Sequence, residues 1–141
     1  ESWMKKITII DGQGGKMGKT IVEQLKKQFP QQEILAVGTN STATAAMLKA
    51  GADYGATGEN PVIVAARDSD LIIGPIGIVI ADSLHGEITP AMAMAVGQSH
   101  AKQLLMPVNR CNHHVIGTDQ MSLNEIIALV IEEVRKCMKE R

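Results

Sequence analysis

The stretch from Ile7 to Thr20 constrains the fold more than any other part of the chain. Four apolar or β-branched residues run into a loop with four glycines in seven positions, Gly12, Gly14, Gly15 and Gly18. A helical pattern follows at once, with apolar residues on one face, Ile21, Val22, Leu25 and Phe29. A strand that turns into a helix through glycines leaves backbone N–H groups free at the positive end of the helix dipole. The stretch therefore predicts a site for a small anionic ligand, above all a nucleotide.

The length of 141 residues indicates one domain, which we place at residues 4–141. Residues 1–3, which precede Met4, are typical of an expression-vector remnant. The net charge of −1 and the spread of Lys and Arg along the chain argue against a nucleic-acid partner, which would require a basic face. The chain has one Trp, one Tyr and one Phe, too few aromatic side chains for a protein that stacks single-stranded bases.

Cysteine usage and hydropathy predict a cytoplasmic protein without a membrane partner. Cys111 and Cys137 form no CxxC pair, and no signal-peptide pattern is visible. The most apolar run, residues 71–81, is about half of the ~20 residues needed to cross a bilayer, and glycine and proline interrupt it.

Strand and helix patterns alternate along the chain. Strands are expected over residues 5–10, 33–37, 70–74, 102–106 and 114–117. Helices are expected from the glycine loop to about residue 28 and over residues 42–50, 91–97 and 123–138. Residues 62–66 fit a short helix or a short strand, residues 78–84 fit either, and residues 52–58 are expected to form a loop. The alternation predicts an α/β fold, a three-layer Rossmann-like, doubly wound and mostly parallel sheet of about five strands.

Ligands of such sheets bind beyond the carboxyl ends of the strands, where the strand order reverses. That rule brings together the loops at residues 12–18, 38–41, 74–77 and 108–112. The candidate binding residues are Gly12, Gln13, Gly14, Gly15, Lys16, Met17, Gly18, Thr39, Asn40, Ser41, Gly74, Pro75, Asn109 and Arg110.

The glycine loop matches neither common nucleotide motif exactly. Gly12, Gly15 and Gly18 give the spacing G-x-x-G-x-x-G in place of G-x-G-x-x-G. Residues 18–20, Gly-Lys-Thr, are the ending of a P-loop, but Gln13 stands where that motif needs its first glycine. A degenerate P-loop NTPase and a plain βα turn without a ligand are therefore alternative interpretations.

The sequence Gly-Gln-Gly-Gly-Lys-Met-Gly of this loop is similar to the Gly-x-Gly-Gly-(Arg/Lys)-Met-Gly loop of dihydrodipicolinate reductases, over residues 7 to about 25. The resemblance implies that the pyrophosphate of a nicotinamide dinucleotide contacts residues of the loop, Gly12, Gln13, Gly15, Lys16 and Met17. There is no room for the substrate domain of that family.

Thr39, Asn40 and Ser41 follow the second strand, where NAD-binding domains usually carry Asp or Glu for the ribose 2′-hydroxyl. Without a carboxylate there, a 2′-phosphate meets no repulsion, so NADP is the expected cofactor ahead of NAD. No arginine stands nearby, and an N-cap for the next helix explains the three residues equally well.

Residues 109–114 hold the densest polar chemistry of the chain. Cys111 with His113 as its base fits a nucleophile. Cys111, His113 and His114 are also metal-ligand types, although in an extended segment His114 points away from the other two. Ligand contact by the polar side chains Asn109, Arg110 and Asn112 is the favoured interpretation, because a guanidinium suits a phosphate or a carboxylate.

Asp82, Glu87 and Thr89 stand close together in the sequence. Two carboxylates five residues apart suit acid–base work, but we expect the commoner roles of helix capping and exposure to solvent. The methionines at 92, 94 and 106 are expected in the core or in a subunit interface. A homodimer is expected, because a lone sheet of this size tends to cover an edge or an apolar helix.

The chain as a whole resembles a family of short, uncharacterised bacterial proteins, a domain of unknown function found mostly in anaerobic Gram-positive bacteria. The segments that carry the resemblance are residues 10–15, 38–41, 43–53, 55–60, 74–78, 86–90 and 109–112. The family implies no assigned activity. The residues themselves thus predict a protein that binds a nucleotide or dinucleotide, with a nonenzymatic ligand sensor or protein-interaction module as the alternative.

Overall fold

The computed structural model describes residues 5–108 and 113–139. Five parallel strands form one sheet, in the order β3-β2-β1-β4-β5. The strands are β1 (Ile7–Asp11), β2 (Ile34–Gly38), β3 (Tyr54–Thr57), β4 (Leu71–Pro75) and β5 (Lys102–Met106). The helices are α1 (Lys16–Gln28), α2 (Ser41–Lys49), α3 (Glu59–Asp68), α4 (Pro90–Gly97) and α5 (Leu123–Lys139), with a 3-10 turn η1 (Ile76–Val79). This is the predicted doubly wound, Rossmann-like α/β fold.

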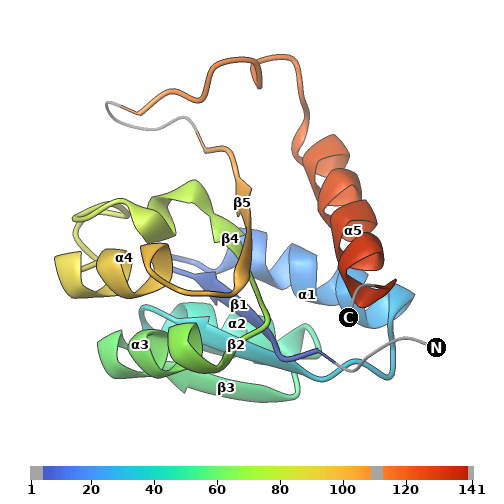
Figure 1. Ribbon diagram of the computed structural model, residues 1–141, viewed down its shortest axis with the longest axis horizontal. Helices are drawn as coiled ribbons and strands as arrows, with labels where there is room; N and C mark the ends of the chain where they lie inside the picture. The colour runs from blue at the N-terminus through green and yellow to red at the C-terminus, as the bar shows by residue number, and fades with distance from the viewer. Residues whose placement is uncertain (1–4, 109–112, 140–141) are drawn as a thin grey trace.

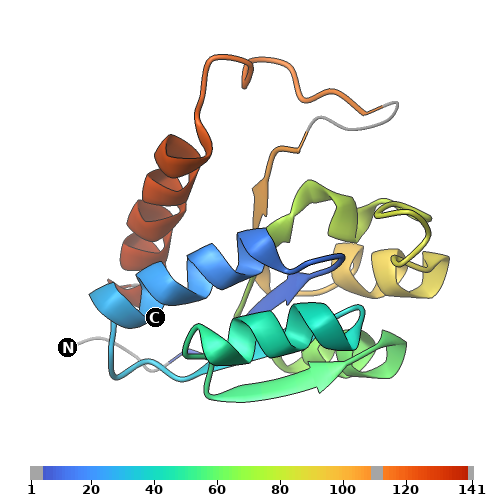
Figure 2. The same cartoon turned by 180° about the vertical axis from the view of Figure 1, so that it is seen from behind.

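Helices cover both faces of the sheet (Figures 1 and 2). Side chains of α1, α2 and α5 pack on one face and side chains of α3 and α4 on the other. The central strand β1 is buried along its whole length, and Ile9 and Ile10 point to opposite cores. A strand buried on both faces has a continuous apolar run, which is why the sequence marked β1 and β4 clearly.

The edge strand β3 corrects one prediction, since residues 52–58 were expected to form a loop. β3 pairs with β2 only, from Leu35 opposite Tyr54 to Gly38 opposite Thr57. Its four residues are exposed or half-buried, so they carry no apolar run that predicts a strand. Gly55 lets the Leu48 side chain of α2 lie close to this strand, because a Cβ atom would stand 2.8 Å from Leu48 Cδ1.

The fifth strand expected at residues 114–117 is also wrong. His114–Gly117 form no strand, and Ile116 is 86% exposed. The chain crosses here from β5 to α5, which returns to the face covered by α1 (Figure 1). Val115 and Ile116 are apolar enough to predict a strand, but the exposure of Ile116 shows that this segment does not lie in the buried sheet.

The ambiguous segments are also settled. Residues 62–66 belong to the helix α3. Residues 78–84 form neither a strand nor an α-helix: residues 78 and 79 end the turn η1, and residues 80–84 form a bend and turns. Of the turn expected at residues 74–77, Gly74 and Pro75 belong to β4, and Ile76 and Gly77 begin η1. The other predicted elements lie where the patterns place them, within one or two residues. No helix in the described ranges is both long and apolar enough to cross a membrane.

Candidate functional site

The glycine loop joins β1 to α1 in a tight turn. The Gly15 amide donates to the Gly12 carbonyl oxygen at 2.9 Å, and the Lys19 amide donates to the Gly15 carbonyl oxygen at 2.8 Å. Gly15 has a φ of 72°. A Cβ atom on Gly15 would also lie 2.8 Å from the Cα atom of Ala43, so only glycine allows α2 to approach this closely.

Asp11, the last residue of β1, accepts hydrogen bonds from two amides of the loop. Its Oδ1 atom accepts from the Gly12 amide at 2.8 Å, and its Oδ2 atom accepts from the Gly18 amide at 2.7 Å. Burial raises the pKa of Asp11, the two amide hydrogen bonds oppose that shift, and the negative charge of Glu87 adds to it. The Gly18 amide, a predicted ligand donor, is thus already paired. Sequence reasoning missed Asp11; its only signal is an acidic residue between a buried strand and a glycine.

Three amides at the start of α1 remain available to a ligand. No described residue accepts a hydrogen bond from the backbone N–H of Gly14, Lys16 or Met17. They border a cavity of about 320 Å³, which we call the glycine-loop cavity. Three apolar side chains from elsewhere in the chain, Leu84, Val108 and Leu123, join the ends of β1 and β4, the glycine loop and the start of α1 in lining it. The residues of those other segments are Asp11, Gly12, Gln13, Gly14, Gly15, Lys16, Met17 and Pro75. The strand order reverses between β1 and β4, so the cavity is at the predicted switch point.

A second cavity, of about 200 Å³, adjoins the first. The two share four lining residues, Gln13, Pro75, Leu84 and Val108. The titratable side chains of the second cavity are Asp82, His85 and His113, and we call it the His85 cavity. His113 therefore lies near the glycine loop, while His114 pairs with Asp119 at 3.2 Å. Cys111, the nucleophile for which His113 is the expected base, lies outside the described residues.

Glu87 ties the glycine loop to the end of β2. Its Oε1 atom accepts hydrogen bonds from the Gln13 amide at 2.8 Å, the Thr39 hydroxyl at 2.5 Å and the Asn40 side-chain amide at 3.0 Å. The expectation that Glu87 caps a helix or faces solvent is therefore wrong. Thr89 does cap α4, through its side chain and the Met92 amide. The partners of Glu87 lie 47 to 74 positions away, so no local pattern could reveal them.

Glu87 is ionised at neutral pH. Partial burial alone would raise the pKa of its carboxyl group, but hydrogen bonds from Gln13, Thr39 and Asn40 bring that pKa below its ordinary value. No described group donates to its second oxygen, Oε2.

The segment that carries Glu87 has an unusual backbone. Asp82, Leu84 and His85 have φ values of 65°, 55° and 56°, and Gly86 has a φ of 89°. Non-glycine residues in the left-handed region are uncommon, and such geometry concentrates at functional sites. The Asp82 amide donates to the Ile88 carbonyl oxygen at 2.7 Å, which closes the segment.

Leu84 of this segment packs directly over the first glycine of the loop. A Cβ atom on Gly12 would lie 2.5 Å from Thr39 Oγ1, 2.7 Å from Glu87 Oε1 and 2.9 Å from Leu84 Cδ1. Only glycine therefore allows the three segments to meet, and the packing holds the loop, the end of β2 and residues 82–88 together.

The structure separates the predicted binding residues into three groups. Those that line the glycine-loop cavity are Gly12, Gln13, Gly14, Gly15, Lys16, Met17 and Pro75. Thr39 and Asn40 bind Glu87, and Asn40 also caps α2 by accepting from the Ala43 amide at 2.8 Å. Gly18 and Gly74 pack against Asp11 and the Ile10 carbonyl group, and Ser41 is exposed at the start of α2. Asn109, Arg110 and Asn112 lie outside the described residues.

The residues of the alternative interpretations are placed as follows. Lys19, the lysine of the P-loop reading, is exposed on α1 and does not line the glycine-loop cavity. Among residues 5–108 and 113–139, no three His, Cys, Asp or Glu side chains gather as metal ligands would.

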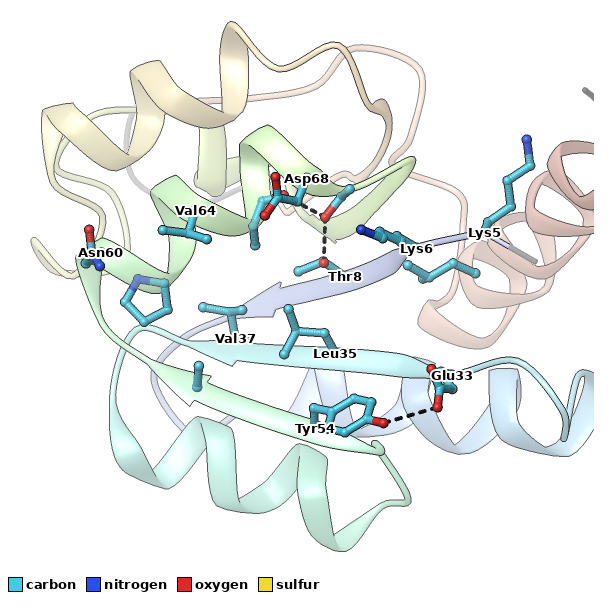
Figure 3. Close-up of a pocket in the computed structure, with 15 residues that line it drawn as sticks. Lys5, Lys6, Thr8, Glu33, Leu35, Val37, Tyr54, Asn60, Val64 and Asp68 are labelled. Carbon is cyan, nitrogen blue, oxygen red and sulfur yellow. Dashed lines mark hydrogen bonds between the residues drawn. The ribbon is translucent and has the colours of Figure 1, made fainter. Parts of the chain in front are cut away.

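A larger groove, of about 530 Å³, lies between α3 and the strands β2 and β3 (Figure 3). Its walls include the apolar side chains of Leu35, Val37 and Val64. Tyr54 donates to Glu33 at its rim at 3.1 Å. No predicted binding residue lines the groove, so we place the candidate site at the glycine loop.

One comparison with a solved structure supports the fold. The FMN-dependent UbiX-like decarboxylase of Escherichia coli O157:H7 matches with a TM-score of 0.51 and 16% sequence identity, over 93% of this chain and 93% of that chain. A short chain alcohol dehydrogenase from Escherichia coli CFT073, complexed with cofactor NADH, matches with a TM-score of 0.49 and 16% identity. That match covers 97% of this chain and 43% of the dehydrogenase, so this chain spans less than half of that protein.

Sequence comparisons identify the family. No curated protein matches the chain. The domain of unknown function DUF3842 matches residues 6–139, nearly the whole sequence, in agreement with the predicted resemblance. The chain therefore belongs to the DUF3842 family.

Proposed function

We propose that this protein binds a nucleotide or a dinucleotide of the NAD(P) kind, with a phosphate on the amides of Gly14, Lys16 and Met17. The observation that carries the proposal is that these three N–H groups, at the positive end of the α1 dipole, have no acceptor among the described residues and border the glycine-loop cavity. Backbone amides at the start of a helix bind phosphate without a dedicated cation, because the N–H groups and the helix dipole both favour negative charge there. Lys16 adds a positive side chain to the same wall.

The residues around the cavity fit the rest of such a ligand. Pro75, Val108 and Leu123 offer apolar surface next to the phosphate position. The adjoining His85 cavity offers two imidazoles, His85 and His113, to the end of the ligand that lies away from the phosphates. A nicotinamide would supply hydride-transfer chemistry when bound, and the imidazole nitrogens can form hydrogen bonds with that end of the ligand.

A matched pair of glycine substitutions tests the proposal. A Cβ atom on Gly14 or on Gly97 meets no protein atom within 4 Å, and neither residue has a positive φ. Gly14→Ala and Gly97→Ala should therefore both fold, with a thermal stability equal to or slightly above that of the native protein. The methyl group on Gly14, however, would stand where a phosphate must approach the loop.

Calorimetric titration with NADH, NADPH and ADP gives the result. We expect at least one of these ligands to bind the native protein, and Gly14→Ala to weaken that binding at least tenfold while Gly97→Ala leaves it unchanged. The proposal fails if none of the three binds at millimolar concentration, or if Gly14→Ala binds as tightly as Gly97→Ala.

A further inference from the structure

We propose that Glu87 determines which dinucleotide the site accepts: its carboxylate accepts hydrogen bonds from the ribose hydroxyls of NAD and repels the 2′-phosphate of NADP. This inference rests on the proposed dinucleotide function and assigns its ligand more narrowly. It reverses the preference for NADP that the residues after β2 predict.

The first argument is the position of the carboxylate. In dinucleotide-binding sheets the acidic group that holds the ribose stands at the end of β2, beside the glycine loop. This chain has Thr39 and Asn40 at that place, and both donate hydrogen bonds to Glu87. The Gln13 amide of the glycine loop donates to the same oxygen. A carboxylate therefore occupies the expected place, although it comes from the segment between β4 and α4.

The second argument is that one carboxylate oxygen of Glu87, Oε2, remains without a donor among the described residues. Oε1 receives all three hydrogen bonds, and no described group donates to Oε2. The side chain is half-buried, and its carboxylate accepts a hydrogen bond from Gln13, which lines the glycine-loop cavity. A carboxylate oxygen accepts hydrogen bonds and cannot donate them, which suits the hydroxyls of a ribose and opposes a phosphate.

The third argument is that Glu87 is held in place. Three donors fix its carboxylate, and the Asp82–Ile88 hydrogen bond closes the segment that carries it. Leu84 of the same segment packs over Gly12. A group fixed in this way loses little freedom when a ligand binds, so little binding free energy is lost in ordering it.

The test compares NADH and NADPH by calorimetry on the native protein, on Glu87→Gln and on Glu23→Gln. Glutamine keeps the shape of the side chain and an oxygen that accepts from Gln13 and Thr39, but it carries no charge. Glu23 is exposed on α1 and undergoes the same chemical change away from the site. We expect the native protein and Glu23→Gln to bind NADH at least tenfold more tightly than NADPH, and Glu87→Gln to reduce that ratio at least fivefold.

A second measurement needs no variant, in case Glu87→Gln does not fold. The native protein should bind 2′-deoxy-NAD at least threefold more weakly than NAD, because one hydroxyl donor is missing. Equal affinity for these two ligands, tighter binding of NADPH than of NADH, or an unchanged ratio in folded Glu87→Gln would each overturn the inference while the dinucleotide function stands. If neither NADH nor NADPH binds at millimolar concentration, the inference falls, and the proposed function then stands only if ADP binds.

Discussion

The Thr39 hydroxyl donates to Glu87 Oε1 at 2.5 Å, across 48 positions of sequence. This hydrogen bond joins the end of β2 to the segment that follows β4, and the Gln13 amide brings the glycine loop to the same oxygen. Three segments at the carboxyl edge of the sheet thus share one carboxylate. Because this group is ionised, its hydrogen bonds are of the stronger, charge-assisted kind.

Thr39→Val should destabilise the protein by about 1–3 kcal/mol. Valine keeps the shape of threonine but removes a donor to a charged oxygen, and such hydrogen bonds contribute about 1.5–3 kcal/mol. Urea denaturation measures the change. Thr42→Val is the control, since Thr42 is exposed on α2, and we expect it to stay within about 0.5 kcal/mol of the native protein. Equal effects of the two substitutions would contradict a structural role for the Thr39–Glu87 hydrogen bond.

Asp11→Ala should lower the free energy of unfolding by about 2 kcal/mol. The substitution leaves the amides of Gly12 and Gly18 without their acceptor, and each unpaired amide is costly where water cannot replace the carboxylate. The net loss is smaller than two full penalties, because removing a buried charge offsets part of the cost. Asp11→Asn, which keeps one acceptor oxygen, should lie between alanine and the native protein in the same urea titration. A loss below about 0.5 kcal/mol for alanine would show that the loop does not depend on Asp11.

The local signals of the sequence were enough to predict β1, the glycine loop and α1. Each depends on neighbours within a few positions: a continuous apolar run, glycines at a turn and a 3.6-residue stripe. An N-cap within residues 39–41 is predictable for the same reason, since the acceptor role of Asn40 reaches only to Ala43. The edge strand β3 was missed because its side chains are not buried, and burial is what makes a strand visible in a sequence.

The chemistry of the site was only partly predictable. The cavity formed by Gly14, Lys16, Met17 and Pro75 follows from the topology rule, which needs only the order of the elements. The role of Glu87 does not follow from any rule about spacing, because a left-handed segment far along the chain carries it to the end of β2. A sequence search for the ribose carboxylate looks directly after β2 and finds only hydroxyl and amide side chains there.

Gly15→Ala should destabilise the protein by about 1–3 kcal/mol, whereas Gly14→Ala should not. Alanine at Gly15 must adopt a φ of 72° and would place its Cβ atom 2.8 Å from Ala43 Cα and 2.9 Å from the Ala43 carbonyl oxygen. Alanine at Gly14 meets nothing within 4 Å. Thermal melts followed by circular dichroism compare the two. If both variants melt together with the native protein, the turn between β1 and α1 is looser than its geometry implies.

Asp53 should make stability fall in acid. The Asp53 carboxylate accepts a hydrogen bond from Lys26 Nζ at 3.0 Å and from the Ile34 amide at 2.8 Å, and so joins α1 to β2. The Lys26 ammonium holds the pKa of Asp53 below 3.8, against a smaller effect of burial, and the Ile34 amide lowers that pKa further. As the pH falls, the unfolded chain therefore protonates Asp53 at a higher pH than the folded protein does. The contribution of Asp53 to stability is complete above pH 3.8 and is lost as the pH falls below it.

Asp53→Asn removes this proton uptake and should flatten the loss of stability as the pH falls below 3.8, the ordinary pKa of this group. At pH 7 the substitution should cost less than about 1 kcal/mol, because the pair is partly exposed. Urea titrations across the acid range provide the measurement. Asp68→Asn, at an exposed position at the end of α3, is the control and should keep the acid slope of the native protein. The same slope in both variants would mean that other carboxylates, and not the Lys26–Asp53 pair, govern the acid sensitivity.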